Sequence, residues 1–158
     1  MDISIQKKPG FIIAGYKMEA IDSSLCPQAW EKLFEQNSLE DLEKMGNGQS
    51  YGVCFDIEDV KHINYMAAYD VKDKDLAEKM NLEIIEIPEN EYAIVELKGE
   101  VPKCIHEGWK YIMEVFFPEH GYMHSGAPDF EVYKEGDMNS FDYEMELWVP
   151  IKKVKSTK

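Results

Sequence analysis

Apolar residues recur at every second position near the end of the chain, where the sequence reads FDYEMELWVPI. Side chains of a strand point alternately to its two faces, so this spacing predicts a β-strand. One face carries the apolar residues Met145, Leu147, Val149 and Ile151. The other face carries Glu144, Glu146 and Trp148. Two carboxylates and an indole on one face are either simply solvated or form the floor of a site.

Two other segments have apolar residues three and four positions apart, which is typical of an amphipathic helix. The first opens at Pro27 with Ala29, Trp30, Leu33 and Phe34, and the second opens near Pro102 with Trp109, Ile112, Met113 and Phe116. Proline is favoured in the first turn of a helix. We expect Pro118 and Gly121 to end the second helix.

Extended segments surround these helices. We expect strands over residues 11–20, 51–56, 63–71 and 127–133, and a strand pair around Pro88 within residues 82–99. The elements recur at a nearly constant offset, because AWEKLFE and SYGVCFD each lie 79 positions before GWKYIME and DFEVYKE. The sequence therefore predicts one α+β domain over residues 1–158. It contains two strand–helix–strand–strand repeats, at about residues 5–78 and 82–153.

The charge of the chain narrows its partners. Asp and Glu number 31 against 17 Lys and Arg, which gives a formal net charge of −14. Phosphates would be repelled, so we expect no nucleic-acid binding, whereas cationic small molecules are favoured if the acidic groups converge on a cleft. We expect no membrane span, because no apolar run approaches the roughly 20 residues that one needs, and no signal peptide, because the segment MDISIQKKPG lacks an apolar core. Its cysteines, Cys26, Cys54 and Cys104, form no metal or redox motif, which indicates reduced thiols in a cytoplasmic protein.

Three segments in order carry a resemblance to a known family. The helix EGWKYIMEVFFPEHGY, the strand GAPDFEVY and the strand EMELWVPI resemble the second repeat of the GyrI-like small-molecule-binding fold. This fold is also the effector-binding domain of AraC- and MerR-type multidrug regulators. The resemblance implies one antiparallel sheet with helices on one side and a ligand groove on the other. The regulators add a DNA-binding segment, whereas the repeats fill this sequence, so we expect a stand-alone form.

The resemblance also assigns the faces of the last strand. The apolar face would pack on the helices, and Glu144, Glu146 and Trp148 would face the groove. Glu146 matches the position where the family's regulators place a buried glutamate beneath a cationic ligand. We expect Glu131 and Tyr133 to line the same side, with Phe130 and Val132 turned inward. In the first repeat Met66 corresponds to Glu146 and Ala68 to Trp148.

The candidate ligand-binding residues are Glu146, Trp148, Glu131, Tyr133, Met66, Glu144 and Tyr65. A simpler interpretation exists for each of them. Polar residues on one face of an antiparallel strand are often only solvated. Glu144 is then a rim charge, and Tyr65, Trp30 and Trp109 belong to the core.

Two functions fit this set of residues. The first is binding of lipophilic, often cationic, aromatic compounds, as a drug sink or a sensor. The second, implied by stand-alone members of the resembled family, is hydrolysis of cyclopropanoid electrophiles, with Glu146 as the catalytic residue that activates water. We expect no cofactor, and no metal, because the loop signals around His120 and His124 argue against a rigid ligand pair. The natural ligand and any protein partner, such as gyrase or a separate transcription factor, are not specified by the sequence.

Overall fold

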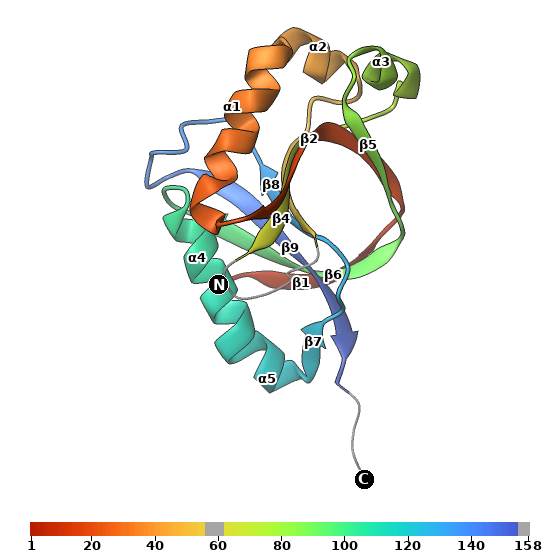
Figure 1. Cartoon of the computed structure of the whole chain (residues 1–158). Helices are drawn as coiled ribbons and strands as arrows, with labels where there is room; N and C mark the ends of the chain where they lie inside the picture. The colour runs from red at the N-terminus through yellow and green to blue at the C-terminus, as the bar shows by residue number, and fades with distance from the viewer. Residues whose placement is uncertain (56–61, 155–158) are drawn as a thin grey trace. The chain divides into compact units, whose positions relative to one another are not determined.

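The computed structural model describes residues 1–55 and 62–154 of the chain (Figure 1). Strands and a smaller number of helices alternate along it, which confirms the predicted α+β class. The chain divides into two compact units. Unit 1 combines Met1–Lys8 with Asn90–Lys158, and unit 2 is Pro9–Glu89.

Unit 2 contains an antiparallel sheet with the strand order β3-β4-β2-β5. Its strands are β2 (Phe11–Ile21), β3 (Ser50–Phe55), β4 (Ile63–Asp70) and β5 (Glu83–Ile87). Its helices are α1 (Cys26–Gln36), α2 (Leu39–Lys44) and α3 (Lys74–Lys79), and a 3-10 turn at Ser23–Leu25 precedes α1. The predicted strands 11–20 and 63–71 are confirmed within a residue at each end, whereas Asp56, the last residue of the predicted strand 51–56, lies outside the described residues.

Unit 1 contains an antiparallel sheet with the strand order β1-β6-β9-β8. Its strands are β1 (Ile3–Lys8), β6 (Asn90–Lys98), β8 (Asp129–Tyr133) and β9 (Glu144–Lys153), and the short β7 (Tyr122–His124) also pairs with β9. Its helical part runs through α4 (Lys103–Tyr111), a π-helical segment at Ile112–Phe116, and α5 (Phe117–His120).

The strands on either side of Pro88 pair with different partners. The two strands predicted within residues 82–99 are present, but they do not pair with each other, because β5 pairs with β2 and β6 pairs with β1 and β9. The strand β1 begins at Ile3 and β5 at Glu83, so they lie 80 positions apart in the sequence. The strand β1 stands at the start of the first predicted repeat but pairs with β6, a strand of the second repeat. Likewise, β5 stands at the start of the second predicted repeat but pairs with β2, a strand of the first. The sequence repeats and the compact units consequently divide the chain at different places.

The second helix ends at Gly121, as expected, but not at Pro118. α4 follows Pro102, as predicted, but the helical backbone continues through Pro118 and stops at Gly121, whose φ of 71° is left-handed. Pro118 therefore does not end the helix. It lies in the first turn of α5, directly after the π-helical segment, where its missing N–H is tolerated.

The cores of both units lie between a sheet face and the helices. In unit 1 the apolar face of β9 packs against Ile105, Ile112 and Phe116, as its alternation predicted. In unit 2, Ala67 and Tyr69 of β4 pack against Ala29 and Leu33 of α1 in the same way. Trp109 and Trp30 are only half-buried at the edges of these cores. Both tryptophans therefore pack against the cores, as the simpler interpretation expected, but neither is fully buried.

Gly15 lies where β2 passes close to β4. A Cβ atom at this position would lie 1.9 Å from the carbonyl oxygen of Ala67, which is a backbone atom and part of the paired strand. Gly108 in α4 is also crowded, but there the nearest atom is Cδ2 of Leu97, 2.6 Å from the ideal Cβ. Only the second contact can be relieved by rotating a side chain.

We expect Gly15→Ala to destabilise the protein by about 1–3 kcal/mol or more, because the backbone of β4 must move. Gly108→Ala is the matched control, since the end of Leu97 can shift and alanine is favoured over glycine in a helix by about 1 kcal/mol. Urea denaturation of the two variants and the wild type measures the difference. Equal losses of unfolding free energy in both variants would contradict this account of Gly15.

Candidate functional site

The face of the unit 1 sheet turned away from the unit's own helices carries most of the candidate chemistry. Residues directly opposite each other in an antiparallel pair point to the same face. Trp148 of β9 lies opposite Ile94 and Phe130, and Glu146 lies opposite Glu96 and Val132. We call this the distal face, defined by Tyr92, Ile94, Glu96, Phe130, Val132, Glu144, Glu146, Trp148 and Pro150.

Three aromatic rings meet on the distal face. The ring centroids of Tyr92, Phe130 and Trp148 are 5.8, 6.0 and 6.1 Å apart in tilted or edge-on geometry. Tyr92 and Phe130 are fully buried, whereas Trp148 is half-buried and forms the accessible side of this aromatic cluster. Burial raises the pKa of the Tyr92 phenol, although the Asn90 amide, which donates to the phenol oxygen at 3.4 Å, lowers it in part.

The carboxylate of Glu146 is held against this cluster. Its Oε1 accepts a hydrogen bond of 2.9 Å from Nε1 of Trp148, and its Oε2 lies 3.8 Å from Nζ of Lys134. The Glu146 side chain is 24% exposed, so the carboxylate is neither free in water nor sealed off. A second ammonium group, that of Lys8, lies 4.8 Å from the centroid of the Trp148 ring.

The register of β8 contradicts one interpretation of the sequence. Glu131 lies opposite Leu147 and Tyr133 opposite Met145, so both point to the helix side and not to the face of Glu146. There Tyr133 packs against the core and donates a 2.7 Å hydrogen bond to Glu131 Oε1. The residues expected inward, Phe130 and Val132, share the distal face instead. The sequence misled because this part of the sheet buries side chains on both faces.

Tyr65 and Met66 belong to unit 2 and point to opposite faces of β4. Tyr65 is buried in the helix-side core, and its hydroxyl oxygen accepts a 3.0 Å hydrogen bond from Nε1 of Trp30. Tyr65 therefore belongs to the core, which was the simpler of the two interpretations of the sequence. Met66 is fully buried on the other face, opposite Val53 and Lys17. Its role as a ligand contact stays a prediction.

Glu144 is the first residue of β9 and is exposed. It lies opposite Lys98 and borders a surface hollow of about 280 Å³, together with Lys134 and Tyr143. This position agrees with the rim charge that the sequence allowed.

The residues of the candidate site that sequence reasoning missed are Tyr92, Phe130, Lys8 and Lys134. Only the pairing register brings them to Trp148 and Glu146.

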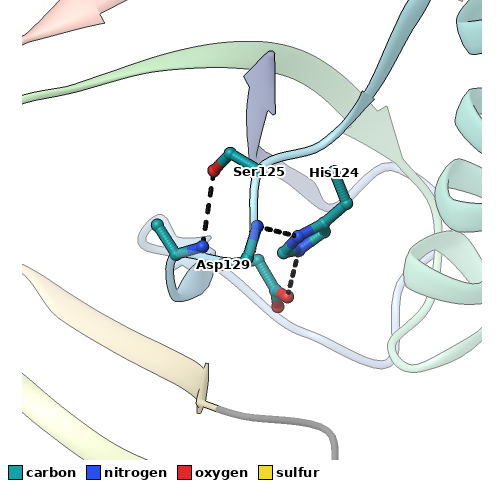
Figure 2. Close-up of polar contacts among 5 residues, drawn as sticks. His124, Ser125 and Asp129 are labelled. Carbon is teal, nitrogen blue, oxygen red and sulfur yellow. Dashed lines mark hydrogen bonds and ion pairs between the residues drawn. The ribbon is translucent and has the colours of Figure 1, made fainter. Parts of the chain in front are cut away.

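The two histidines brace the region between the helix and β8. The ring of His120 stacks on the ring of Phe116, and Nδ1 of His120 lies 3.1 Å from the carbonyl oxygen of Phe116. Nδ1 of His124 accepts from the Gly126 N–H at 3.0 Å, which leaves Nε2 to donate to Asp129 Oδ2 at 3.3 Å (Figure 2). Among residues 1–55 and 62–154 no group of three or more potential metal ligands occurs.

Ser125 sits beside His124 and Asp129 but does not complete a nucleophile–base arrangement. Its Oγ accepts from the Ala127 N–H at 3.3 Å, while both ring nitrogens of His124 are engaged by Gly126 and Asp129 (Figure 2). A catalytic serine would need its hydroxyl hydrogen-bonded to the imidazole. These contacts therefore fix the turn between β7 and β8 and the start of β8.

In the described part of the chain, no helix has both the length and the apolar character that crossing a bilayer requires.

Unit 1 thus has a sheet backed by helices, with a carboxylate beside a buried aromatic cluster on its other face. Residues 1–152 match the family model described as the GyrI-like small molecule binding domain. The chain therefore belongs to the GyrI-like family. No curated protein matches it by sequence.

Solved structures share the fold along nearly the whole chain. SAV2435 bound to tetraphenylphosphonium has a TM-score of 0.78 at 22% identity, covering 96% of this chain and 94% of that one. The EcmrR C-terminal domain has a TM-score of 0.69 at 18% identity, with coverages of 97% and 98%. A hydrolase encoded by lin2189 from Listeria innocua has a TM-score of 0.62 at 13% identity, with coverages of 95% and 91%. At these identities the likeness shows the fold alone.

The buried phenol of Tyr92 makes stability depend on alkaline pH. Burial raises the pKa of this phenol, so the folded protein keeps the proton above about pH 10, where the unfolded chain loses it. The stabilisation is therefore complete below about pH 10 and is lost as the pH rises toward the higher folded pKa. We expect Tyr92→Phe to reduce this loss, measured by denaturation at about pH 9 and about pH 11. Tyr111→Phe, at a half-buried tyrosine of α4, is the control, and an unchanged loss in Tyr92→Phe would contradict the expectation.

Proposed function

We propose that this protein binds lipophilic aromatic cations at the distal face of unit 1, with Glu146 as the counter-charge and Trp148 as the ring partner. The observation that carries the proposal is the hydrogen bond between the Glu146 carboxylate and the Trp148 indole, at the accessible side of the aromatic cluster. Membership of the GyrI-like family supports small-molecule binding. The tetraphenylphosphonium held by SAV2435, which has the same fold, supports a cationic aromatic ligand.

The physical argument begins with the carboxylate. Partial burial removes part of its hydration, so a nearby cation is attracted more strongly than it would be in water. The indole N–H fixes the carboxylate relative to the ring, and a cation between them gains from both groups. Ring-to-ring contact adds apolar burial but demands little of the exact shape of the ligand. Such a site selects by charge and aromaticity, which suits a drug sink or a sensor.

Hydrolysis of a cyclopropanoid electrophile is the second candidate, and the fold shared with the Listeria innocua hydrolase favours its consideration. Glu146 would then act as the base that activates water. Both of its oxygens are already engaged, Oε1 by the Trp148 indole and Oε2 by the Lys134 ammonium. The indole N–H occupies one of the directions from which a water would approach Oε1. We therefore favour binding over hydrolysis.

Glu146→Gln keeps the shape of the side chain and an oxygen that accepts from the Trp148 indole, but removes the charge. We expect this variant to bind tetraphenylphosphonium more weakly by about 1–3 kcal/mol, while the neutral triphenylphosphine oxide changes little. Isothermal titration calorimetry measures both affinities. Glu144→Gln is the matched control, and it should lose less because its carboxylate is exposed and screened by water.

Equal affinities for both probes in the wild type and in Glu146→Gln would rule out Glu146 as the counter-charge. The hydrolase alternative has a different signature. Glu146→Gln would then abolish turnover of a cyclopropanoid substrate and leave its binding nearly intact.

A further inference from the structure

Two lysines of unit 1 stand where the proposed function places the charge of a ligand. We propose that Lys8 and Lys134 are internal cations that occupy the site in the unliganded protein, and that a cationic ligand binds by displacing them. The two residues would then set the affinity and the selectivity of the site. This inference rests on the proposed function and assigns its specificity-determining residues.

Lys134 occupies the carboxylate. Its Nζ lies 3.8 Å from Oε2 of Glu146, on the side of the carboxylate away from the indole bond. The side chain of Lys134 is 48% exposed, so its ammonium can move from the carboxylate directly into water. A displaceable partner of this kind keeps Glu146 paired when no ligand is present.

Hydrogen bonds hold the backbone of Lys134, whereas its side chain is 48% exposed. Its N–H donates to the hydroxyl oxygen of Tyr143 at 3.0 Å, and the same hydroxyl donates to the Lys134 carbonyl at 2.7 Å. Tyr143 is 3% exposed, so its ring is held in the core, while the two hydrogen bonds themselves are partly buried. The flexible stem of Lys134 therefore always starts from the same place beside Glu146, and the ammonium returns to the carboxylate whenever the site is empty.

Lys8 occupies the ring. It is the last residue of β1, held by its register opposite Asn90 of β6, and its Nζ lies 4.8 Å from the centroid of Trp148. This distance is within the roughly 6 Å over which an ammonium is attracted to an aromatic face. Lys8 and Lys134 reach the same hydrogen-bonded pair from different strands, one at the indole and the other at the carboxylate.

Selectivity follows from this competition. A small, strongly hydrated cation gains nothing at the site that the lysines do not already supply. A lipophilic cation additionally covers the Trp148 ring with apolar surface, which an ammonium cannot do. Only the second class of ligand gains enough to displace both lysines. The internal cations therefore raise the threshold for binding and reject common metabolic amines and metal cations.

The test removes the internal cations and keeps the length of the side chains. Lys8→Met and Lys134→Met should each tighten tetraphenylphosphonium binding roughly two- to fivefold, the factor expected for an exposed cation–π contact or ion pair, and the double variant should gain more. Tetraphenylborate, which has the same shape and the opposite charge, should bind more weakly in the same variants. Triphenylphosphine oxide, which is neutral, should change little. Titration calorimetry of all three probes gives these ratios.

The matched control is a double variant, Lys110→Met with Lys153→Met. It lowers the net charge of unit 1 by the same amount as the double variant Lys8→Met with Lys134→Met. Both control lysines are exposed, Lys110 on α4 and Lys153 as the last residue of β9. An equal gain in the control would show that the total charge of the protein is responsible, and would overturn the inference. Unchanged or weaker tetraphenylphosphonium binding in Lys8→Met and Lys134→Met would also overturn it.

The outcomes separate this inference from the proposed function. If Glu146→Gln weakens binding but the lysine variants do not tighten it, the lysines are not competitors and the proposed function stands. If Glu146→Gln has no effect in the wild type or in the double lysine variant, the proposed function itself fails. Binding that is absent in the wild type but present in the double variant supports internal competition. Absence of binding in both overturns the two together.

Discussion

The pairing register of β8 against β9 determines which side chains of unit 1 meet. With Phe130 opposite Trp148, an aromatic ring completes the cluster on the distal face, and Glu131 stays on the helix side. A shift of one residue would exchange the two faces of β8 and place a carboxylate against the indole. Polar contacts hold both ends of the strand. His124 binds Asp129 at its start, and the hydroxyl of Tyr143 clamps the backbone of Lys134 directly after its end.

The same register explains what the sequence could and could not predict. The alternation of β9 and the apolar stripes of the two helices were predictive, because each element buries one face and presents the other to a more polar surrounding. DFEVY alternates equally well, but Phe130 and Val132 are buried on the distal face while Asp129 is buried on the other. Local periodicity cannot relate β8 to β9 across the loop of residues 134–143. The partners of β5 and β6 were missed for a similar reason, since nearness in sequence suggested a hairpin and the actual partners are distant.

Lysines lie beside acidic groups of the candidate site, although the chain as a whole is strongly acidic. Glu144 lies opposite Lys98, and Glu146 has Lys134 beside it. Under the proposed function, the net charge would attract cations to the protein in general, whereas desolvation and ring contact at Trp148 would decide which of them bind. Lys8 has no signal in the local sequence, because its position over the indole depends on β1 lying beside β6.

The pairing of β1 with β6 also has a consequence for biosynthesis. Ile3 pairs with Val95, so β1 has no partner until β6 has been made, while unit 2 is one continuous segment. Unit 2 can begin to fold on the emerging chain, whereas unit 1 closes only after its last strands are made. In that interval β1 is an unpaired strand that carries Ile3 and Ile5, and chaperones that recognise extended apolar segments have time to act on it. The contact between Lys8 and Trp148 can thus form only after β9 has been made.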